Sequence, residues 1–263
     1  MGVHTLLPTF SYHSVIPKNR LSAVLLLILI LILLMSCAIH PRTETPVPSI
    51  KFAVAKGLGK TLLIMLPGSG DRAGSFVKTG FVDIADRQQF DVLAVDAHFG
   101  YYAKGILVER LREDIIIPAR AQGYENIWLL GISMGGLGAL LYVAEYPNEI
   151  DGVILLAPFL GSSRLVEDIK NAGGLGAWSG DSQGFKPYEV DVWRWLKKEI
   201  VGDGGTPVYI GFGQSDSMAP AYDLLVQALD PSHVYTSSGG HNWKTWEPLW
   251  ARIAADLEVS RGN

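Results

Sequence analysis

Ser133 lies in a pattern of residues that suits a nucleophile. It is the central residue of GISMG at residues 131–135, which follows an apolar run and precedes a helical pattern. Glycines on both sides of a serine permit a sharp turn from strand to helix, which leaves the hydroxyl exposed at the end of the strand. A plain strand-to-helix turn can have the same pattern, so the chemistry depends on partners elsewhere in the chain.

A serine hydroxyl needs a base to take its proton, and the base needs an acid to fix its tautomer. His241 follows a predicted strand at 234–236, and Asp216 follows one at 207–211. Both residues therefore belong at the same sheet edge as Ser133. Asp216 could instead be a surface residue of a turn. Asp168, which comes after a predicted strand at 152–157, is the second candidate for the acid.

The remaining histidines suit other roles. His98 follows a predicted strand at 91–96, where we expect it in solvent or on a pocket wall. His233 precedes the last strand and so belongs at the opposite sheet edge, in a structural role. The histidines are scattered and there is one cysteine, which gives no metal-ligand spacing, and no Walker A sequence is present. We therefore expect neither a metal nor a cofactor.

Short apolar runs alternate with helical patterns along the chain. The predicted strands are 61–66, 91–96, 126–131, 152–157, 207–211 and 234–236, with 50–55 as a further candidate. The predicted helices are 76–89, 106–122, 135–146, 192–199, 219–229 and 243–259. Apolar strands separated by helices indicate an α/β fold with a parallel sheet covered on both faces. The glycine-rich stretch 171–184 is expected to be a loop or a small cap.

Residues 50–260 resemble the α/β-hydrolase superfamily. The resemblance rests on the turn at Ser133, on the order Ser133, Asp216, His241, and on a glycine-rich turn after 61–66. The resemblance implies a mostly parallel sheet with helices on both faces and a short or minimal cap. It also implies an esterase-like serine hydrolase that cleaves a small-molecule acyl substrate through an acyl-enzyme. By the family pattern, the N–H groups of Ser69 and Met134 form the oxyanion hole. Many members have His-Gly in the first turn, where this chain has Pro67 and glycine.

Two alternatives from other classes stay open. The segment GSGDRA at 68–73, with Asp96 after the next strand, fits the dinucleotide-binding fingerprint of an oxidoreductase. That interpretation leaves Asp216 and His241 without a role. The other alternative is a non-catalytic hydrolase-fold protein that acts as a binding or scaffold protein of the cell envelope.

The N-terminus is typical of an export signal or a membrane anchor. Lys18 and Arg20 precede an apolar stretch at 21–35, and residues 34–37 read LMSC. This tetrapeptide resembles the lipobox of bacterial lipoproteins, which implies lipidation at Cys37. An uncleaved transmembrane anchor or a soluble secreted form are the alternatives. We expect a signal or anchor at 1–37, a tether at 38–49 and a catalytic domain at 50–263 that is held at a membrane outside the cytoplasm, in the bacterial cell envelope or periplasm.

The net charge and the aromatic residues indicate less about function than the motifs do. The formal net charge is −4 without a basic cluster, which argues against binding to nucleic acid. Trp178 and Phe185 could line a substrate pocket or pack a loop against the body. Trp193 and Trp195, on the predicted helix 192–199, could contact a membrane or the core.

Overall fold

The computed structural model describes residues 42–53, 60–181, 183–202 and 205–261. The apolar stretch 21–35, the lipidation candidate Cys37 and residues 38–41 of the predicted tether lie outside the described residues. Within the described ranges, no helix combines the length and the apolar character that crossing a bilayer requires.

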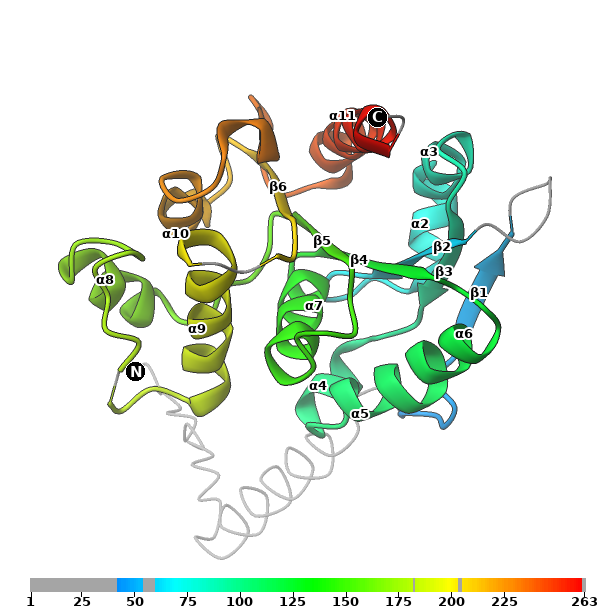
Figure 1. The fold of residues 1–263 in the computed structure, drawn as a ribbon, viewed down its shortest axis with the longest axis horizontal. Helices are drawn as coiled ribbons and strands as arrows, with labels where there is room; N and C mark the ends of the chain where they lie inside the picture. Colours follow the sequence, from blue (N-terminus) through cyan, green and yellow to red (C-terminus); the bar gives the residue numbers. More distant parts are fainter. Residues whose placement is uncertain (1–41, 54–59, 182, 203–204, 262–263) are drawn as a thin grey trace, which may run out of the picture. The chain divides into compact units, whose positions relative to one another are not determined.

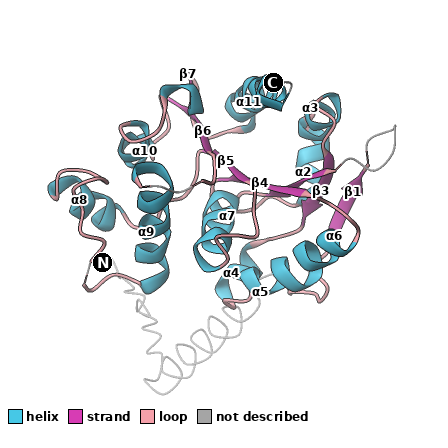
Figure 2. Cartoon of the chain, viewed as in Figure 1, coloured by secondary structure: helices cyan, strands magenta, loops and turns pink. Residues whose placement is uncertain are grey.

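A seven-stranded sheet forms the centre of the described body (Figures 1 and 2). The strands run in the order β1-β3-β2-β4-β5-β6-β7, and only β1 is antiparallel to its neighbour. Their bounds are β1 Ser49–Phe52, β2 Thr61–Leu66, β3 Asp91–Val95, β4 Asn126–Ile132, β5 Gly152–Leu156, β6 Val208–Gly213 and β7 Val234–Ser237. The predicted α/β architecture is confirmed.

Helices cover both faces of this sheet, with α2, α3 and α11 on one face and α5, α7 and α9 on the other (Figure 1). The helices are α2 Ala73–Lys78, α3 Phe81–Arg87, α4 Phe99–Ala103, α5 Leu107–Leu111, α6 Ile117–Ala121, α7 Met134–Glu145, α8 Ser163–Asn171, α9 Pro187–Val201, α10 Ala219–Val226 and α11 Trp243–Arg261. A π-helical turn, η1 (Arg112–Ile116), joins α5 to α6, and a 3₁₀ turn, η2 (Pro231–His233), precedes β7.

The central strands are apolar because both faces of the sheet are covered. Every residue of β5 is buried, as is every residue of β2 after Thr61. Burial on both sides explains why these strands read as continuous apolar runs and not as an alternating pattern.

Two predicted helices are interrupted in the structure. The one predicted at 76–89 is split into α2 and α3 at Gly80, whose φ of 75° lies in the left-handed region that glycine adopts without strain. The one predicted at 106–122 contains the π-helical turn η1. Helices α4 and α8 were not predicted.

The folded body begins earlier than residue 50. The Glu44 N–H donates to the Tyr101 hydroxyl at 3.0 Å, and the Val47 N–H donates to Asp114 at 2.8 Å. The Val47 side chain is buried. Residues 42–49 of the predicted tether therefore pack on the domain, and the predicted boundary at residue 49 is too late.

Candidate active site

Ser133 is held in a strained turn between β4 and α7. Its φ is 51° and its ψ is −113°, an uncommon backbone conformation for a residue other than glycine. The surrounding backbone fixes this turn, because the Ser133 N–H donates to the Leu156 carbonyl at 2.9 Å and the Ser133 carbonyl accepts from the Phe159 N–H at 2.9 Å. Residues in such conformations cluster at functional sites, where neighbouring contacts maintain the strain.

The glycines on either side of Ser133 allow close packing of β2, β4 and α7. A Cβ added to Gly135 would lie 2.0 Å from the Leu66 carbonyl oxygen. A Cβ on Gly131 would lie 2.3 Å from the Gly135 carbonyl oxygen. Both distances are far below van der Waals contact, so a side chain at Gly135 would push α7 away from the end of β2, and one at Gly131 would push α7 away from β4.

His241 and Asp216 lie beside this turn, as the sequence predicted. The His241 Nε2 lies 2.9 Å from the Ser133 Oγ, and the His241 Nδ1 lies 2.7 Å from the Asp216 Oδ2. The Asp216 side chain is fully buried, and its other carboxylate oxygen accepts the Met218 N–H at 2.9 Å. A buried carboxylate with two donors fixes the orientation of the imidazole toward the serine.

The loops after β6 and β7 are joined through their backbones, which places Asp216 and His241 together. The Gln214 N–H donates to the Ser237 carbonyl at 2.7 Å, and the Ser215 N–H donates to the Gly239 carbonyl at 3.0 Å. A Cβ on Gly213 would lie 1.9 Å from the Gly239 carbonyl oxygen, so only glycine permits this approach.

The turn after β2 lies against Ser133. A Cβ on Gly68 would lie 3.5 Å from the Ser133 Cβ, so the residue before Ser69 is in near contact with the serine. Met134 is the first residue of α7, and the first N–H groups of a helix have no acceptor within the helix. The turn at 67–70 and the start of α7 thus both lie next to Ser133.

Two contacts around the site were missed by sequence reasoning. The Tyr102 hydroxyl, from α4, donates to the Met134 carbonyl at 2.9 Å. The Trp246 indole packs edge-on against the His241 ring, with centroids 4.9 Å apart and an interplanar angle of 88°. The Trp246 contact could have been suspected, since this residue follows His241 on the next helix, but no sequence signal marks Tyr102.

The other predicted polar residues lie elsewhere. Asp168 lies at an exposed position of α8, and Asp216 takes the place beside His241. His98 is buried and caps α4, with its Nδ1 accepting the Gly100 N–H at 3.1 Å, so its predicted position in solvent is wrong, and the pocket-wall alternative stays a prediction. His233 packs against the Tyr209 ring, with centroids 4.1 Å apart, at the opposite edge of the sheet.

The dinucleotide alternative requires the Asp96 carboxylate to bind a ribose, but this carboxylate is already hydrogen-bonded to other residues of the chain. Its carboxylate accepts from both the Arg72 guanidinium and the Ala73 N–H at the start of α2. Burial alone would raise the pKa of Asp96, but these hydrogen bonds and the Arg72 charge outweigh it and hold the pKa below its usual value. The strand order also differs from the dinucleotide-binding order. There the first parallel strand lies between the second and the fourth, whereas here the first parallel strand, β2, lies between the second and the third, β3 and β4.

Two cavities are lined by residues next in sequence to Ser133 or to Asp216, and none of Ser133, Asp216 and His241 lines either of them. One, of about 460 Å³, is lined by residues of α4, α5 and α7 that include Met134. The second, of about 500 Å³, lies between the segment 158–163 and the segment after Asp216.

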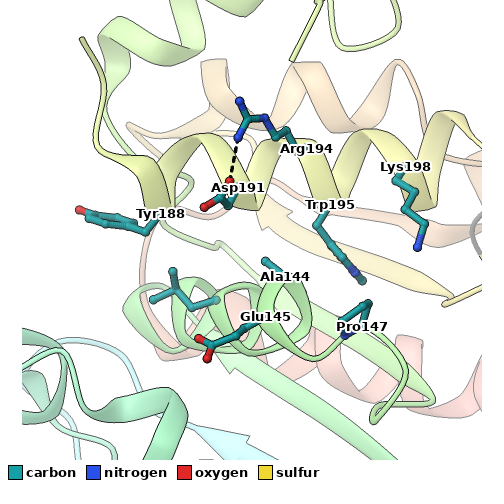
Figure 3. Close-up of a pocket in the computed structure, with 9 residues that line it drawn as sticks. Ala144, Glu145, Pro147, Tyr188, Asp191, Arg194, Trp195 and Lys198 are labelled. Atoms are coloured by element: carbon teal, nitrogen blue, oxygen red, sulfur yellow. Dashed lines mark hydrogen bonds and ion pairs between the residues drawn. The ribbon is translucent and has the colours of Figure 1, made fainter. Parts of the chain in front are cut away.

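A third cavity, of about 500 Å³, lies between α7 and α9 (Figure 3). None of Ser133, Asp216 and His241 lines it, and Arg194 pairs with Asp191 along its edge.

The aromatic residues considered for a pocket or a membrane mostly belong to the core. Trp178, Trp193 and Trp195 are buried. Phe185 is half-buried, with the Arg164 guanidinium 4.6 Å from its ring centre. Among the described residues, no group of three or more His, Cys, Asp or Glu side chains could hold a metal ion.

Comparisons with known proteins agree with the fold. Residues 59–179 match a family model described as serine aminopeptidase, S33. No curated protein sequence matches the chain.

Solved structures with a similar fold include several hydrolases. Fluorophosphonate-binding serine hydrolase F of Staphylococcus aureus has a TM-score of 0.55 at 14% identity, covering 82% of this chain and 96% of that one. The monoacylglycerol lipase of Paleococcus ferrophilus has a TM-score of 0.53 at 18% identity, with coverages of 81% and 98%. Est1E of Butyrivibrio proteoclasticus, solved with ferulic acid bound, has a TM-score of 0.54 at 15% identity, with coverages of 81% and 94%.

At these identities the structural likeness shows the fold alone, and the family model matches residues 59–179, which include Ser133 but neither Asp216 nor His241. The chain has the α/β-hydrolase fold.

Proposed function

We propose that this α/β-hydrolase cleaves an ester-like acyl bond, with Ser133 as nucleophile, His241 as base and Asp216 as the acid that orients it. One observation carries the proposal: hydrogen-bonding distances run unbroken from the buried Asp216 carboxylate through His241 to Ser133. Such a constellation is identified by its geometry and not by its place in the sequence.

The two contacts of His241 support a separate role for each of its nitrogens. Asp216 is an acceptor, so the Nδ1 carries the proton and the Nε2 accepts from the Ser133 hydroxyl. As the Ser133 Oγ forms a bond to the substrate carbonyl carbon, its proton passes to Nε2. The same proton then moves to the leaving oxygen as the bond from carbon to that oxygen breaks. Water repeats the sequence to release the acid and restore Ser133.

The N–H groups of Ser69 and Met134 are the donors that we assign to the oxyanion. The nearness of Gly68, the residue before Ser69, to Ser133 and the place of Met134 at the start of α7 support the assignment. Removing one such donor from a hydrolase costs about 3–4 kcal/mol of transition-state stabilisation.

We propose further that the domain acts outside the cytoplasm of a bacterium, attached to the membrane through its N-terminus. The LMSC sequence at 34–37 and the charges at Lys18 and Arg20 support this attachment. In cells fed a labelled fatty acid, the full chain should take up label and Cys37→Ala should not. Label in both variants, or in neither, would contradict lipidation at Cys37.

A panel of acyl esters and aminoacyl amides tests the reaction type. We expect turnover of esters by the full chain, loss of that turnover in Ser133→Ala, and no change in Ser232→Ala, an exposed serine in η2 at the opposite sheet edge. Faster turnover of amides would favour a peptidase, in line with the description of the matched family model. A folded protein without turnover of either class would favour the non-catalytic alternative.

A further inference from the structure

A carboxylate outside the Ser133, His241 and Asp216 constellation lies close to the nucleophile. A Cβ built on Gly68 would lie 3.5 Å from the Ser133 Cβ and 3.7 Å from the Asp71 Oδ2. Both groups therefore border the small space beside Gly68 that a side chain there would fill. Ser133 and Asp71 are half-buried and Ser69 is exposed, so these residues lie at the surface of the body, where a substrate can reach them.

The turn after β2 holds the Asp71 carboxylate in place. The Asp71 N–H donates to the Gly68 carbonyl at 3.1 Å, which closes a turn around Ser69 and Gly70. Gly70 has a φ of 86°, a value that glycine adopts without strain. The Ser75 hydroxyl donates to the Asp71 Oδ1 at 3.0 Å. One carboxylate oxygen is thus held by Ser75, and the other is the one that lies near Gly68.

The neighbouring arginine is engaged with a different carboxylate. The Arg72 guanidinium donates to both carboxylate oxygens of Asp96 and forms an ion pair with it. The charges of Arg72 and Asp96 cancel within this pair. Of the charged side chains at 71, 72 and 96, the Asp71 carboxylate is therefore the one whose charge is left over.

A negative charge at this place affects the proposed reaction. Attack by Ser133 puts negative charge on the carbonyl oxygen in the transition state. A nearby carboxylate repels that charge, which raises the barrier for a neutral substrate. A positive group of the substrate beside the carboxylate reverses the sign of the contribution, because the new attraction offsets the repulsion.

We propose that Asp71 is a specificity-determining residue that binds a positively charged group of the substrate, which makes the preferred substrate a cationic ester. The inference rests on the proposed function. Attraction between a carboxylate and an ammonium group at a half-exposed site corresponds to roughly fivefold to tenfold in kcat/KM. Asp71 lies beside the nucleophile itself, so the test places the positive charge once on the alcohol and once on the acid.

Two pairs of esters differ in charge but hardly in shape, because a tert-butyl group replaces a trimethylammonium group. Acetylcholine and its tert-butyl isostere carry the difference on the alcohol. The methyl ester of γ-trimethylammoniobutyric acid and its tert-butyl isostere carry it on the acid. Titration of the released acid at constant pH gives the kcat/KM of the full chain for each ester.

In the wild type, the cationic member of at least one pair should have a kcat/KM about fivefold to tenfold above that of the neutral member. Asp71→Asn keeps an oxygen acceptor for Ser75 and removes the charge. Its kcat/KM should fall for the cationic ester and rise about twofold for the neutral one, since the repulsion is also lost. A residue that only supports the turn would lower both.

Two further measurements check that the effect is local and electrostatic. Asp83→Asn removes the same charge at an exposed position of α3 and should keep the wild-type ratio of cationic to neutral ester. Added salt should lower this ratio in the wild type and leave the ratio of Asp71→Asn nearly unchanged.

Three results would overturn the role of Asp71. One is a ratio near or below one in the wild type for both pairs, and another is the wild-type ratio in Asp71→Asn. The third is an equal loss for cationic and neutral esters in Asp71→Asn. All three require ester turnover that depends on Ser133. If Ser133→Ala keeps the turnover of the wild type, the proposed function itself fails, which distinguishes the two failures.

Discussion

Two aspartates follow parallel strands at the same edge of the sheet, and their surroundings give them different roles. Asp96 follows β3 and accepts from the Arg72 guanidinium and from the start of α2. Asp216 follows β6 and lies 2.7 Å from an imidazole whose second nitrogen faces the Ser133 hydroxyl. Arg72, the partner of Asp96, holds that carboxylate in an ion pair, whereas His241, the partner of Asp216, connects its carboxylate to the Ser133 hydroxyl. Position at a strand end makes a residue a candidate, and the partner decides what the residue can do.

The contrast between the two loops would be wrong if the loop after β3 took part in catalysis. We expect His241→Ala to lower kcat by about a million-fold, as removal of the base does in a comparable triad enzyme. His98→Asn, in the other loop, keeps a side-chain acceptor for the start of α4 and should retain nearly full activity. Single-turnover hydrolysis of an activated ester measures both variants. A large loss in His98→Asn would contradict the division of roles.

The same substitution at the two aspartates sharpens the comparison. Asp216→Asn removes the negative charge and replaces one carboxylate oxygen with an NH2 donor, which holds His241 in the wrong tautomer, so kcat should fall by about 10⁴-fold. Asp96→Asn should lower kcat less than tenfold, since the Asp96 carboxylate accepts hydrogen bonds from Arg72 and Ala73. Equal losses in the two variants would show that both carboxylates serve catalysis.

The ion pair between Asp96 and Arg72 should instead contribute to the free energy of unfolding. Asp96→Asn should lower the free energy of unfolding at neutral pH by about 1–2 kcal/mol, because a charge-assisted hydrogen bond to a half-exposed arginine is lost. The pKa of Asp96 is lowered in the folded state, so its contribution is full above the pKa of the unfolded chain and is lost as the pH falls through the folded value. Urea unfolding at neutral and acidic pH checks this, and the wild type and Asp96→Asn should converge in acid. A constant difference across that range would contradict the ion pair.

The smallest expected effect tests how α4 supports the Ser133 turn. Tyr102→Phe removes the hydrogen bond to the Met134 carbonyl, and one neutral hydrogen bond contributes about 1 kcal/mol. We expect kcat to fall roughly fivefold with KM nearly unchanged, if Tyr102 positions the proposed oxyanion donor. A change in KM alone would assign Tyr102 to substrate binding.

Much of the sheet could be predicted from sequence because burial on both faces leaves apolar runs. The strand predicted at 61–66 is β2 as observed, and the other parallel strands shift by two residues or fewer at each end. Helix α8 was missed although Leu165, Val166 and Ile169 are buried on one side of it. Helix α9 begins at Pro187, five residues before the predicted start, where proline occupies the first turn.

Of the site, the three chemical groups could be predicted and most of their support could not. The glycines on both sides of Ser133 mark it as a candidate nucleophile. Asp216 and His241 are candidates because each follows a parallel strand, and the residues just after parallel strands lie at one edge of the sheet. The contacts of Tyr102 and Trp246 and the walls of the cavity lined by α4, α5 and α7 depend on the packing of helices distant in sequence. No local pattern encodes that packing, so these features emerged only from the structure.

The most direct test of the central claim is the rate at which a fluorophosphonate modifies the full chain, with the modified residue located by peptide mass spectrometry. We expect rapid modification of Ser133 alone and a rate at least a thousandfold lower in His241→Gln, since the serine hydroxyl reacts only when a base takes its proton. Modification of another residue, or an equal rate in His241→Gln, would contradict the activation of Ser133 by His241.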